Sequence, residues 1–230
     1  HLPLAIVPAE EKLHGIHYES PVASAQFKSA ILLAGLYADA PTTVTEPYVS
    51  RDHTEQMLWG FGVRLEQSGT SITIFPVEEE AYRAPDEITV PGDISSAAYF
   101  LVAGTIIDGS HLLLKNVGIN PTRTGILDVL TEMGAHIHLQ KERRSGGERV
   151  ADIIVESASL RGVSFGAEIM PRLIDEIPAL AAAALFAEGD TVITGAGELR
   201  VKETDRLHAI AEEFQKLAPG SIEEQDEGLV

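Results

Sequence analysis

Ten consecutive residues, Glu198 to Leu207, gather positive charge in a chain that is otherwise acidic. Arg200, Lys202 and Arg206 lie within seven positions of a 230-residue protein whose formal net charge is −18. The segment precedes a helical pattern of apolar residues over 207–217. Free backbone N–H groups and the helix macrodipole attract anions at a helix start, so these cations predict a site for a negatively charged ligand.

The spacing within this segment indicates individual contacts. Lys202 and Arg206 are four positions apart, so on a helix they would share one face. Arg206 suits a bidentate contact with a carboxylate, Lys202 suits a phosphate, and Glu203 could exchange a proton. The alternative is a solvated helix face on which Glu203 and Asp205 are simple counter-charges, and the charge pattern fits both.

Two other loops place polar groups at helix starts. Ser24 and Gln26 offer a hydroxyl and an amide beside free N–H groups, which suits a phosphate or sugar-like ligand, although Ser24 could simply cap its helix. Arg51 either meets an anion or pairs with Asp52 or Glu55. Asp52 and Glu55 have the spacing of a capping box.

Asp175 and Glu176 place two carboxylates at the start of the most apolar helix of the chain. A carboxylate there is stabilised as the anion, whereas one that its neighbours bury has a raised pKa and can act as a general base. Helix capping alone is the alternative. Arg123 stands in the second copy of a repeated pattern of elements, described below, at the place that Arg51 has in the first copy. We interpret Arg123 as a structural echo of Arg51.

The composition limits the class of protein. Hydrophobic residues make up 44% of the chain, which is typical of a globular protein of one or two domains. There is no cysteine, which excludes disulfides and thiolate metal sites, and no apolar run reaches the about 20 residues of a membrane span. We therefore expect a cytoplasmic protein without a membrane partner, and the acidic balance argues against nucleic acid as a partner.

His136 and His138 alternate on one strand, where we expect an exposed face because no third metal ligand is evident.

One pattern of elements occurs three times. Each copy has an apolar helix, a β-branched strand, a second amphipathic helix and a hairpin, with a strand expected before it. The apolar helices are 25–37, 95–107 and 174–186, the second helices are 55–61, 125–133 and 207–217, and the preceding strands are 15–19, 87–90 and 164–168. Helices that are apolar on every side are buried, so the sequence predicts an α/β (α+β) fold with helices inside a ring of sheets.

We expect parts of two domains. Residues 77–86 are acidic, lack periodicity and contain Pro85, so this segment is the predicted boundary. Residues 1–84 are assigned to the first domain and residues 85–230 to the second. The chain begins in a strand-like run and ends in a hairpin-like one, so we expect it to be part of a longer protein.

Six loops, taken in order, resemble one known family. They are Ser-Ala-Gln at 24–26, Ser-Arg-Asp-His-Thr-Glu at 50–55, Pro-Gly-Asp-Ile-Ser-Ser at 91–96, Asn-Pro-Thr-Arg-Thr-Gly at 120–125, Asp-Glu-Ile-Pro at 175–178 and Arg-Val-Lys-Glu-Thr-Asp-Arg at 200–206. Together they resemble the 5-enolpyruvylshikimate-3-phosphate (EPSP) synthases, in the bacterial class II form. No single motif is decisive, but six in order are a specific signal that spans nearly the whole chain.

The resemblance implies a fold and a reaction. The enolpyruvyl transferase fold has two domains, each of three β-α-β-α-β-β units around buried helices. The reaction transfers the carboxyvinyl group of phosphoenolpyruvate to the 5-hydroxyl of shikimate 3-phosphate and releases phosphate, on the route to chorismate and the aromatic amino acids. The resemblance implies no metal or organic cofactor, and a monomer when the protein is complete.

The resemblance also implies residue roles. Shikimate 3-phosphate would be bound by Ser24, Ala25, Gln26, Arg51, Asp175 and Lys202, and phosphoenolpyruvate by Gln26 and Arg206. Asp175 would be the base on the attacking hydroxyl, and Glu203 would protonate the methylene carbon of phosphoenolpyruvate. Two positions depart from the family: Ala25 stands where other members have Ser, and Glu198 stands where some have Asn.

Several family motifs are absent from these residues, among them an early Lys-Ser loop and a late catalytic Lys, so we expect the chain alone to turn over poorly or not at all. Two alternatives remain. UDP-N-acetylglucosamine enolpyruvyl transferase has the same fold, but its reactive Cys has no counterpart here, and residues 200–206 favour the shikimate enzyme. A non-catalytic fragment of the fold would keep an anion site without the chemistry.

Overall fold

The computed structural model describes residues 4–7, 9–77, 83 and 86–230 of the chain. The chain forms two compact units, His1–Ile88 and Thr89–Val230. Most of the segment 77–86, which was expected to be the boundary, lies outside the described residues. Within the described part, every helix is too short or too polar to cross a membrane.

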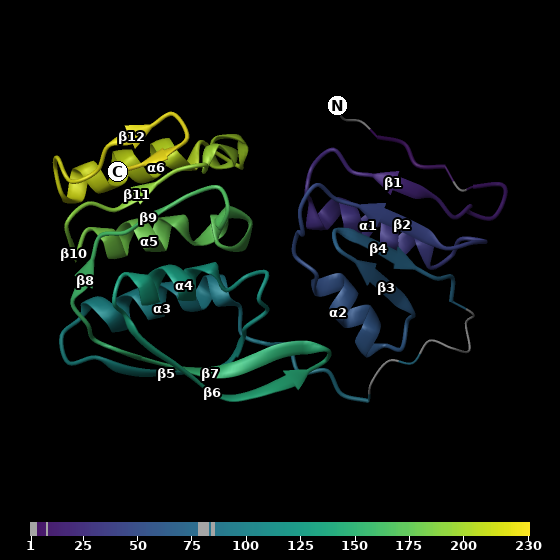
Figure 1. Ribbon diagram of the computed structural model, residues 1–230, viewed down its shortest axis with the longest axis horizontal. Coiled ribbons are helices and arrows are strands. Elements are labelled where there is room, and N and C mark those ends of the chain that lie inside the picture. The colour runs from purple at the N-terminus through teal and green to yellow at the C-terminus, as the bar shows by residue number, and fades with distance from the viewer. Residues whose placement is uncertain (1–3, 8, 78–82, 84–85) are drawn as a thin grey trace. The chain divides into compact units, whose positions relative to one another are not determined.

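The first unit is a four-stranded sheet with two helices (Figure 1). Its elements are β1 (His17–Glu19), α1 (Ala25–Gly35), β2 (Thr42–Thr45), α2 (His53–Gly60), β3 (Leu65–Ser68) and β4 (Ser71–Ile74). The strand order is β1-β2-β4-β3, in which β1 is parallel to β2 and the other neighbours are antiparallel. This order of elements confirms the pattern predicted for the first repeat.

The close approach of α1 to this sheet depends on Gly35. A Cβ atom at this position would lie 2.8 Å from Ile74 Cγ2 and 2.9 Å from Thr42 Cβ, so any side chain would push α1 away from the sheet. Elsewhere α1 exposes Phe27 and Leu33. Among the described residues α1 packs mainly on β2 and β4 and also contacts α2 through Lys28 and Ser29, so in this chain the predicted enclosure by sheets is not seen around α1.

The second unit contains the other two repeats. Its helices are α3 (Ile94–Ile106), α4 (Gly125–Glu132), α5 (Ile177–Ala184) and α6 (Arg206–Leu217), with 3₁₀ turns η2 (Met170–Arg172), η3 (Ile174–Glu176) and η4 (Gly197–Val201). Its strands are β5 (His111–Gly118), β6 (His136–Ser145), β7 (Glu148–Glu156), β8 (Leu160–Arg161), β9 (Ser164–Phe165), β10 (Ala187–Glu188), β11 (Val192–Ile193), β12 (Glu224–Gln225) and β13 (Gly228–Leu229). They form the sheets β5-β7-β6 and β12-β13-β11-β9 and the pair β10-β8.

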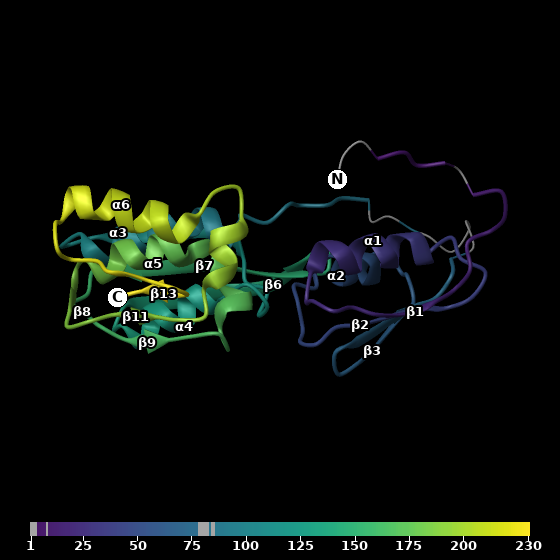
Figure 2. The same cartoon turned by 90° about the horizontal axis from the view of Figure 1, so that it is seen from above.

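Helix α5 lies in the core of the second unit. None of its residues is exposed, and it packs against α3 and β8, while α3 packs on β5 and β7. Figure 2 shows α3, α5 and α6 with their axes running in similar directions. Leu101 of α3 and Leu180 of α5 are both fully buried. The prediction of a buried apolar helix is confirmed here, where sheets and other helices surround α5.

One predicted strand is absent from the structure, and one pair of strands was not predicted. Residues 87–90 form no strand, and the nearest pairing is a parallel bridge between Gly92 and Val117. The parallel pair β8 and β10 was not predicted. Strands of two residues leave no alternation in the sequence, so only the packing of distant segments creates them.

We expect Leu180→Ala to lower the free energy of unfolding of the second unit by about 2–5 kcal/mol, because it removes a fully buried side chain and leaves a cavity. Urea unfolding followed by circular dichroism measures this loss. The control is Leu217→Ala on α6, where the side chain is 76% exposed and a change within about 0.5 kcal/mol is expected. Equal losses for the two variants would contradict the central position of α5.

Candidate functional site

The N-terminal ends of four helices come together in the second unit. Ser95 in the first turn of α3 donates a hydrogen bond to Oε1 of Glu176, the N-cap residue of α5. Arg123, which directly precedes the N-cap of α4, donates to both of these side chains. Arg206, the first residue of α6, contacts Asp175. Because each helix start carries partial positive charge, this convergence favours an anion near these residues.

Asp175, Glu203 and Arg206 form one ion-pair cluster. Arg206 Nη1 lies 3.3 Å from Asp175 Oδ1, and Arg206 Nη2 lies 2.6 Å from Glu203 Oε2. The side chains of Asp175 and Arg206 are partly buried, at 29% and 26% exposure, whereas Glu203 is 75% exposed. The structure therefore brings together three of the predicted site residues, although Asp175 and Arg206 are 31 positions apart in the sequence.

The charges of this cluster stabilise one another. Hydrogen bonding from its own backbone N–H and from Arg206 lowers the pKa of Glu203 below its ordinary value. The pKa of Arg206 is raised, chiefly by Glu203 and then by Asp175. In this arrangement Glu203 is an anion near neutral pH. To donate a proton, Glu203 must first take one up, and a ligand carboxylate that takes over the Arg206 guanidinium would favour this by removing a cation that stabilises the Glu203 anion.

Lys202 and Arg206 do not share a helix, so the common helical face that their spacing would allow does not form. The 3₁₀ turn η4 ends at Val201, and α6 starts only at Arg206. The reason is Asp205, whose side chain accepts the backbone N–H of His208 and so caps the helix one residue before Arg206. Lys202 Nζ instead lies 2.8 Å from Glu198 Oε1.

The side chain of Arg200 is held by contacts with Asp205 and with the β12–β13 hairpin. Its Nη1 lies 2.8 Å from both Asp205 and Glu224, and it donates to the backbone oxygens of Gln225 and Asp226. These contacts tie η4 to the β12–β13 hairpin. The counter-charge interpretation is therefore correct for Asp205 with Arg200 and for Glu203 with Arg206, although Glu203 also belongs to the Asp175 cluster.

In the first unit, Ser24 caps α1. Its Oγ accepts a hydrogen bond from the backbone N–H of Phe27 at 3.4 Å, so the capping interpretation is confirmed. Gln26 is exposed on the first turn of α1, and Arg51 is half-buried just before α2. The N-terminal parts of the two helices are in contact, because Ser29 Oγ and Thr54 Oγ1 are 2.7 Å apart.

A buried ion cluster lies beneath these helix starts. Lys28 Nζ lies 3.0 Å from Glu46 Oε2 and 2.8 Å from Glu55 Oε1, and all three side chains are at most 10% exposed. Ser50, next to Arg51, donates its hydroxyl to Glu46. Lys28 thus joins α1, α2 and the loop after β2, which fixes the positions of the residues that the sequence proposed as ligands.

Glu55 turns inward to this cluster, so its predicted capping box is wrong. Asp52, the N-cap residue of α2, makes no side-chain capping hydrogen bond and accepts instead from Gln56. Desolvation raises the pKa of Glu55, and the contact with Lys28 only partly offsets this effect. The capping-box spacing could not reveal the outcome, because the competing partner Lys28 comes from another helix.

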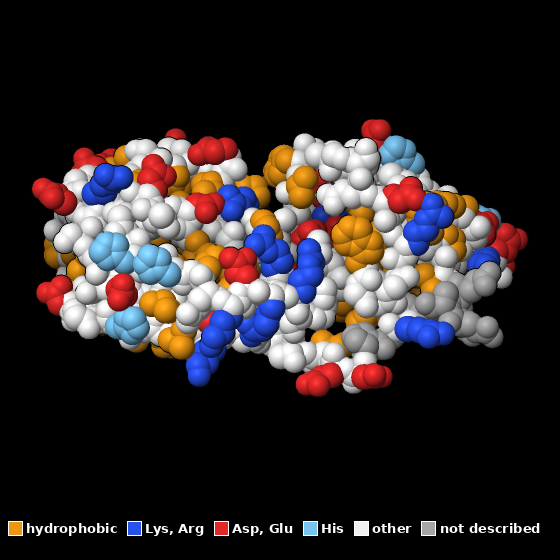
Figure 3. All heavy atoms as spheres, turned by 60° about the horizontal axis from the view of Figure 1, so that its bottom comes forward, with side chains coloured by type: hydrophobic (Ala, Val, Ile, Leu, Met, Phe, Trp, Pro, Cys, Tyr) orange, Lys and Arg blue, Asp and Glu red, His pale blue; other side chains and the backbone are white. Residues whose placement is uncertain are grey.

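Histidines gather on the outer face of the β5-β7-β6 sheet, shown in pale blue in Figure 3. His111 and His136 both lie opposite Glu156 in the sheet register, and His138 lies two positions further along β6. His136 and His138 are exposed, as predicted. In the described part of the chain, no group of three or more His, Asp or Glu side chains is placed to hold a metal ion.

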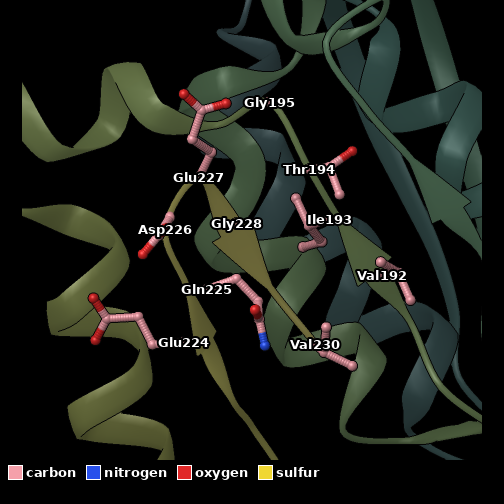
Figure 4. A pocket seen from close by; sticks show the side chains of 10 residues that line it. All are labelled: Val192, Ile193, Thr194, Gly195, Glu224, Gln225, Asp226, Glu227, Gly228 and Val230. Carbon is pink, nitrogen blue, oxygen red and sulfur yellow. The ribbon is translucent and has the colours of Figure 1, made fainter.

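An open hollow along β11 and the β12–β13 hairpin contains none of the predicted ligands (Figure 4). The side chains of Glu224, Asp226 and Glu227 contribute to its lining. These carboxylates disfavour a negatively charged ligand, so the hollow does not compete with the helix N-termini as an anion site.

Sequence reasoning missed two groups of residues around the predicted site. The burial of Lys28 between two carboxylates was not predicted. Arg123 was treated as an echo of Arg51, whereas it bonds to Ser95 and Glu176. For Lys28 the available signal was a single cation within a largely apolar helix, since such a residue must be paired if it is buried.

Lys28→Met should lower the free energy of unfolding of the first unit by about 3–5 kcal/mol, because it leaves two buried carboxylates without their cation. Fluorescence of Trp59, the single tryptophan, reports on this unit during urea unfolding. In the control Arg64→Met, which lies in the same unit, the side chain is 67% exposed and loses a surface pair with Glu66, so a change within about 1 kcal/mol is expected. A loss of that small size for Lys28→Met would refute the burial of the cluster.

The raised pKa of Glu55 predicts a pH dependence. The folded state holds the Glu55 proton more tightly than the unfolded state, so Glu55 contributes stability below its ordinary pKa of 4.5 and loses it as the pH rises through the folded pKa. The free energy of unfolding of the wild type relative to Glu55→Gln should therefore fall as the pH rises from 4.5. Urea titrations at several pH values, read by Trp59 fluorescence, measure this difference. A difference that rises with pH would contradict the assigned sign.

Comparison with known sequences identifies relatives along the whole chain. A family model described as EPSP synthase (3-phosphoshikimate 1-carboxyvinyltransferase) matches residues 1–230. A protein of Desulforudis audaxviator named 3-phosphoshikimate 1-carboxyvinyltransferase is 55% identical over 228 residues, which are 99% of this chain and 52% of that protein. The Bacillus subtilis protein of the same name is 53% identical over 227 residues, again 99% of this chain and 52% of the relative.

Solved structures agree with the predicted enolpyruvyl transferase fold. EPSP synthase from Acinetobacter baumannii matches with a TM-score of 0.88 and 45% identity, covering 96% of this chain and 49% of that one. The enolpyruvyl transferase NikO from Streptomyces tendae matches with a TM-score of 0.63 at 22% identity, over 81% of this chain and 45% of NikO, which shows likeness of fold alone. The chain spans about half the length of the curated relatives it matches. Since the family model matches from the first residue to the last, the chain belongs to the EPSP synthase family.

Proposed function

We propose that the protein to which this chain belongs transfers the carboxyvinyl group of phosphoenolpyruvate to the 5-hydroxyl of shikimate 3-phosphate and releases inorganic phosphate. The observation that carries the proposal is the Asp175–Arg206–Glu203 cluster at converging helix starts, in a chain of the EPSP synthase family. The relatives described above bear the name of this activity, which favours it over UDP-N-acetylglucosamine transfer.

The second unit contributes the proton-transfer groups. Asp175 takes the proton of the attacking 5-hydroxyl as that oxygen bonds to C2 of phosphoenolpyruvate, and Glu203 supplies a proton to the methylene carbon. The Glu203 carboxylate then takes a proton back from the resulting methyl group as the C2–O bond to phosphate breaks, which restores the double bond and releases phosphate. Arg206 binds the carboxylate of phosphoenolpyruvate, and Lys202 binds shikimate 3-phosphate. Binding of that carboxylate by Arg206 would free Glu203 for proton transfer, since the two side chains are paired in this structure.

The first unit contributes groups for shikimate 3-phosphate. Ser24 and Ala25 lie at the start of α1, where backbone N–H groups can bind phosphate, and Gln26 follows on its first turn. Gln26 also contacts phosphoenolpyruvate in this proposal. Arg51 adds a cation at the start of α2. Because Ala25 has no hydroxyl, its contribution comes from the backbone alone.

Proton transfer and charge neutralisation account for both the addition and the elimination, so we assign no metal or organic cofactor to the reaction. Two small-molecule substrates are the proposed partners, without nucleic acid or membrane. We further propose a cytoplasmic monomer. Since the chain spans about half of its curated relatives, full turnover is assigned to the complete protein, and the chain alone is expected to release little phosphate.

Phosphate release from shikimate 3-phosphate and phosphoenolpyruvate tests the proposal. The complete protein should release phosphate only when both substrates are present. Each substrate omitted in turn is the control, because a phosphatase would act on one substrate alone. Release without phosphoenolpyruvate, or no release from the complete protein, would overturn the assignment. Steady release by the 230-residue chain would refute the expectation that it is inactive alone.

Arg206→Ala should raise the KM for phosphoenolpyruvate by about 10-fold or more, because it removes a charge-assisted contact with the carboxylate. The KM for shikimate 3-phosphate should change far less. Initial rates in the complete protein measure both constants. The control is Arg161→Ala, which removes an exposed arginine that donates to the backbone carbonyl oxygen of Glu132. Equal increases for the two substrates would contradict the assigned contact.

A further inference from the structure

Glu176 is a carboxylate buried beside Asp175, with a relative exposure of 1%. Its Oε1 accepts hydrogen bonds from Ser95 Oγ and from Arg123 Nη2, the latter at 3.3 Å. Within the described residues its Oε2 is buried without a hydrogen-bond partner. A carboxylate in such a place is costly unless a cation balances it.

Arg123 supplies that cation. Its side chain is 13% exposed, and its Nη2 also donates to Ser95 Oγ and lies 3.7 Å from Asp93 Oδ1. Asp93 is the N-cap residue of α3, and Arg123 precedes the N-cap of α4. One guanidinium therefore joins the starts of α3, α4 and α5, and the sequence separation from Arg123 to Glu176 is 53 positions.

The charge balance of this pair acts on Asp175, the next residue in the chain. The negative charge of Glu176 on the adjacent residue disfavours the anionic form of Asp175, and the Arg123 guanidinium bonded to Glu176 offsets that effect. Arg206 and its partner Glu203 are also near Asp175. Helices α3 and α5 contain no charged residue, and Arg172 on the neighbouring turn η2 is paired with Asp128 of α4 at 2.8 Å.

We propose that Arg123 and Glu176 form a positioning pair that orients Asp175 and, by balancing the adjacent buried charge, keeps Asp175 able to accept a proton. The pair touches no substrate in this proposal; it acts through Asp175. The inference builds on the proposed function of Asp175 as the base, but its physical content is the protonation of Asp175, which can be measured without turnover.

The test is the pH titration of the Asp175 carboxyl carbon by NMR in the 230-residue chain with ¹³C-labelled aspartate, assigned by comparison with Asp175→Asn. Arg123→Met removes the cation and should raise the midpoint by about one pH unit, because Glu176 is then unbalanced. Glu176→Gln removes the anion and should lower it. Arg123→Lys keeps the charge and should stay near the wild type, and the double variant Arg123→Met, Glu176→Gln should return toward it.

Arg172→Met is the matched control. It removes an arginine that contacts the same loop, through Pro121 O at 2.8 Å and Thr124, but that pairs with the exposed Asp128. The Asp175 midpoint should not move in this variant. Circular dichroism melting of every variant identifies any that do not fold, and Glu176→Gln with Arg123→Lys tests the charge effect if Arg123→Met fails. An unchanged Asp175 midpoint in Glu176→Gln, or an equal shift in Arg172→Met, would overturn the proposal.

The same variants separate this inference from the proposed function. If Asp175 is the base, the acidic limb of the pH–rate profile of the complete protein should move in the same direction as the NMR midpoint. If the NMR midpoints move as expected but Asp175→Asn leaves the rate of the complete protein unchanged, the pair still sets the protonation of Asp175 and the assignment of the base is wrong. Unchanged midpoints together with an inactive Asp175→Asn would instead refute the pair and leave the base in place.

Discussion

Charge buried at helix starts is the constraint on which both units depend. A carboxylate in the protein interior is stable only with a cation and hydrogen bonds, and helix N-termini supply part of that compensation through their free N–H groups. In the first unit Lys28 lies between Glu46 and Glu55, and in the second unit Arg123 bonds to Glu176. Each cluster holds together segments that are distant in the sequence.

These clusters explain how small loops can carry precise chemistry. The loop that contains Arg51 is anchored because its neighbour Ser50 donates to the buried Glu46. Asp175 is anchored because its neighbour Glu176 is locked between α3 and α4. In both cases the buried residue fixes the backbone, and the adjacent residue is the one to which the proposed function assigns a ligand contact. Pre-organisation of this kind reduces the conformational entropy lost on binding.

The segment 198–207 shows how one cluster of cations divides into separate tasks. Arg200 is committed to the β12–β13 hairpin through Glu224 and the backbone. Arg206 stands at the start of α6, within reach of Asp175 and Glu203. Lys202 lies between them on a non-helical turn, because Asp205 delays the start of the helix. The single helical face that the spacing suggested is thus replaced by two cations in different environments, suited to two different anionic groups.

The sequence by itself determined the repeated order of elements, the buried helix α5 and the family, because periodicity and ordered loop motifs are local properties. It also offered Ser24 as a cap of α1, which the structure confirms, since a cap needs only a hydroxyl three residues before its N–H partner. Only the tertiary structure decided that Glu55 pairs with Lys28 instead of forming a capping box. The same holds for the exposed side of α1 in this chain and for the bond between Arg123 and Glu176. Each of these outcomes depends on a partner from another element. Burial decides which charged groups pair, and the spacing of residues in the sequence does not reveal which side chains are buried together.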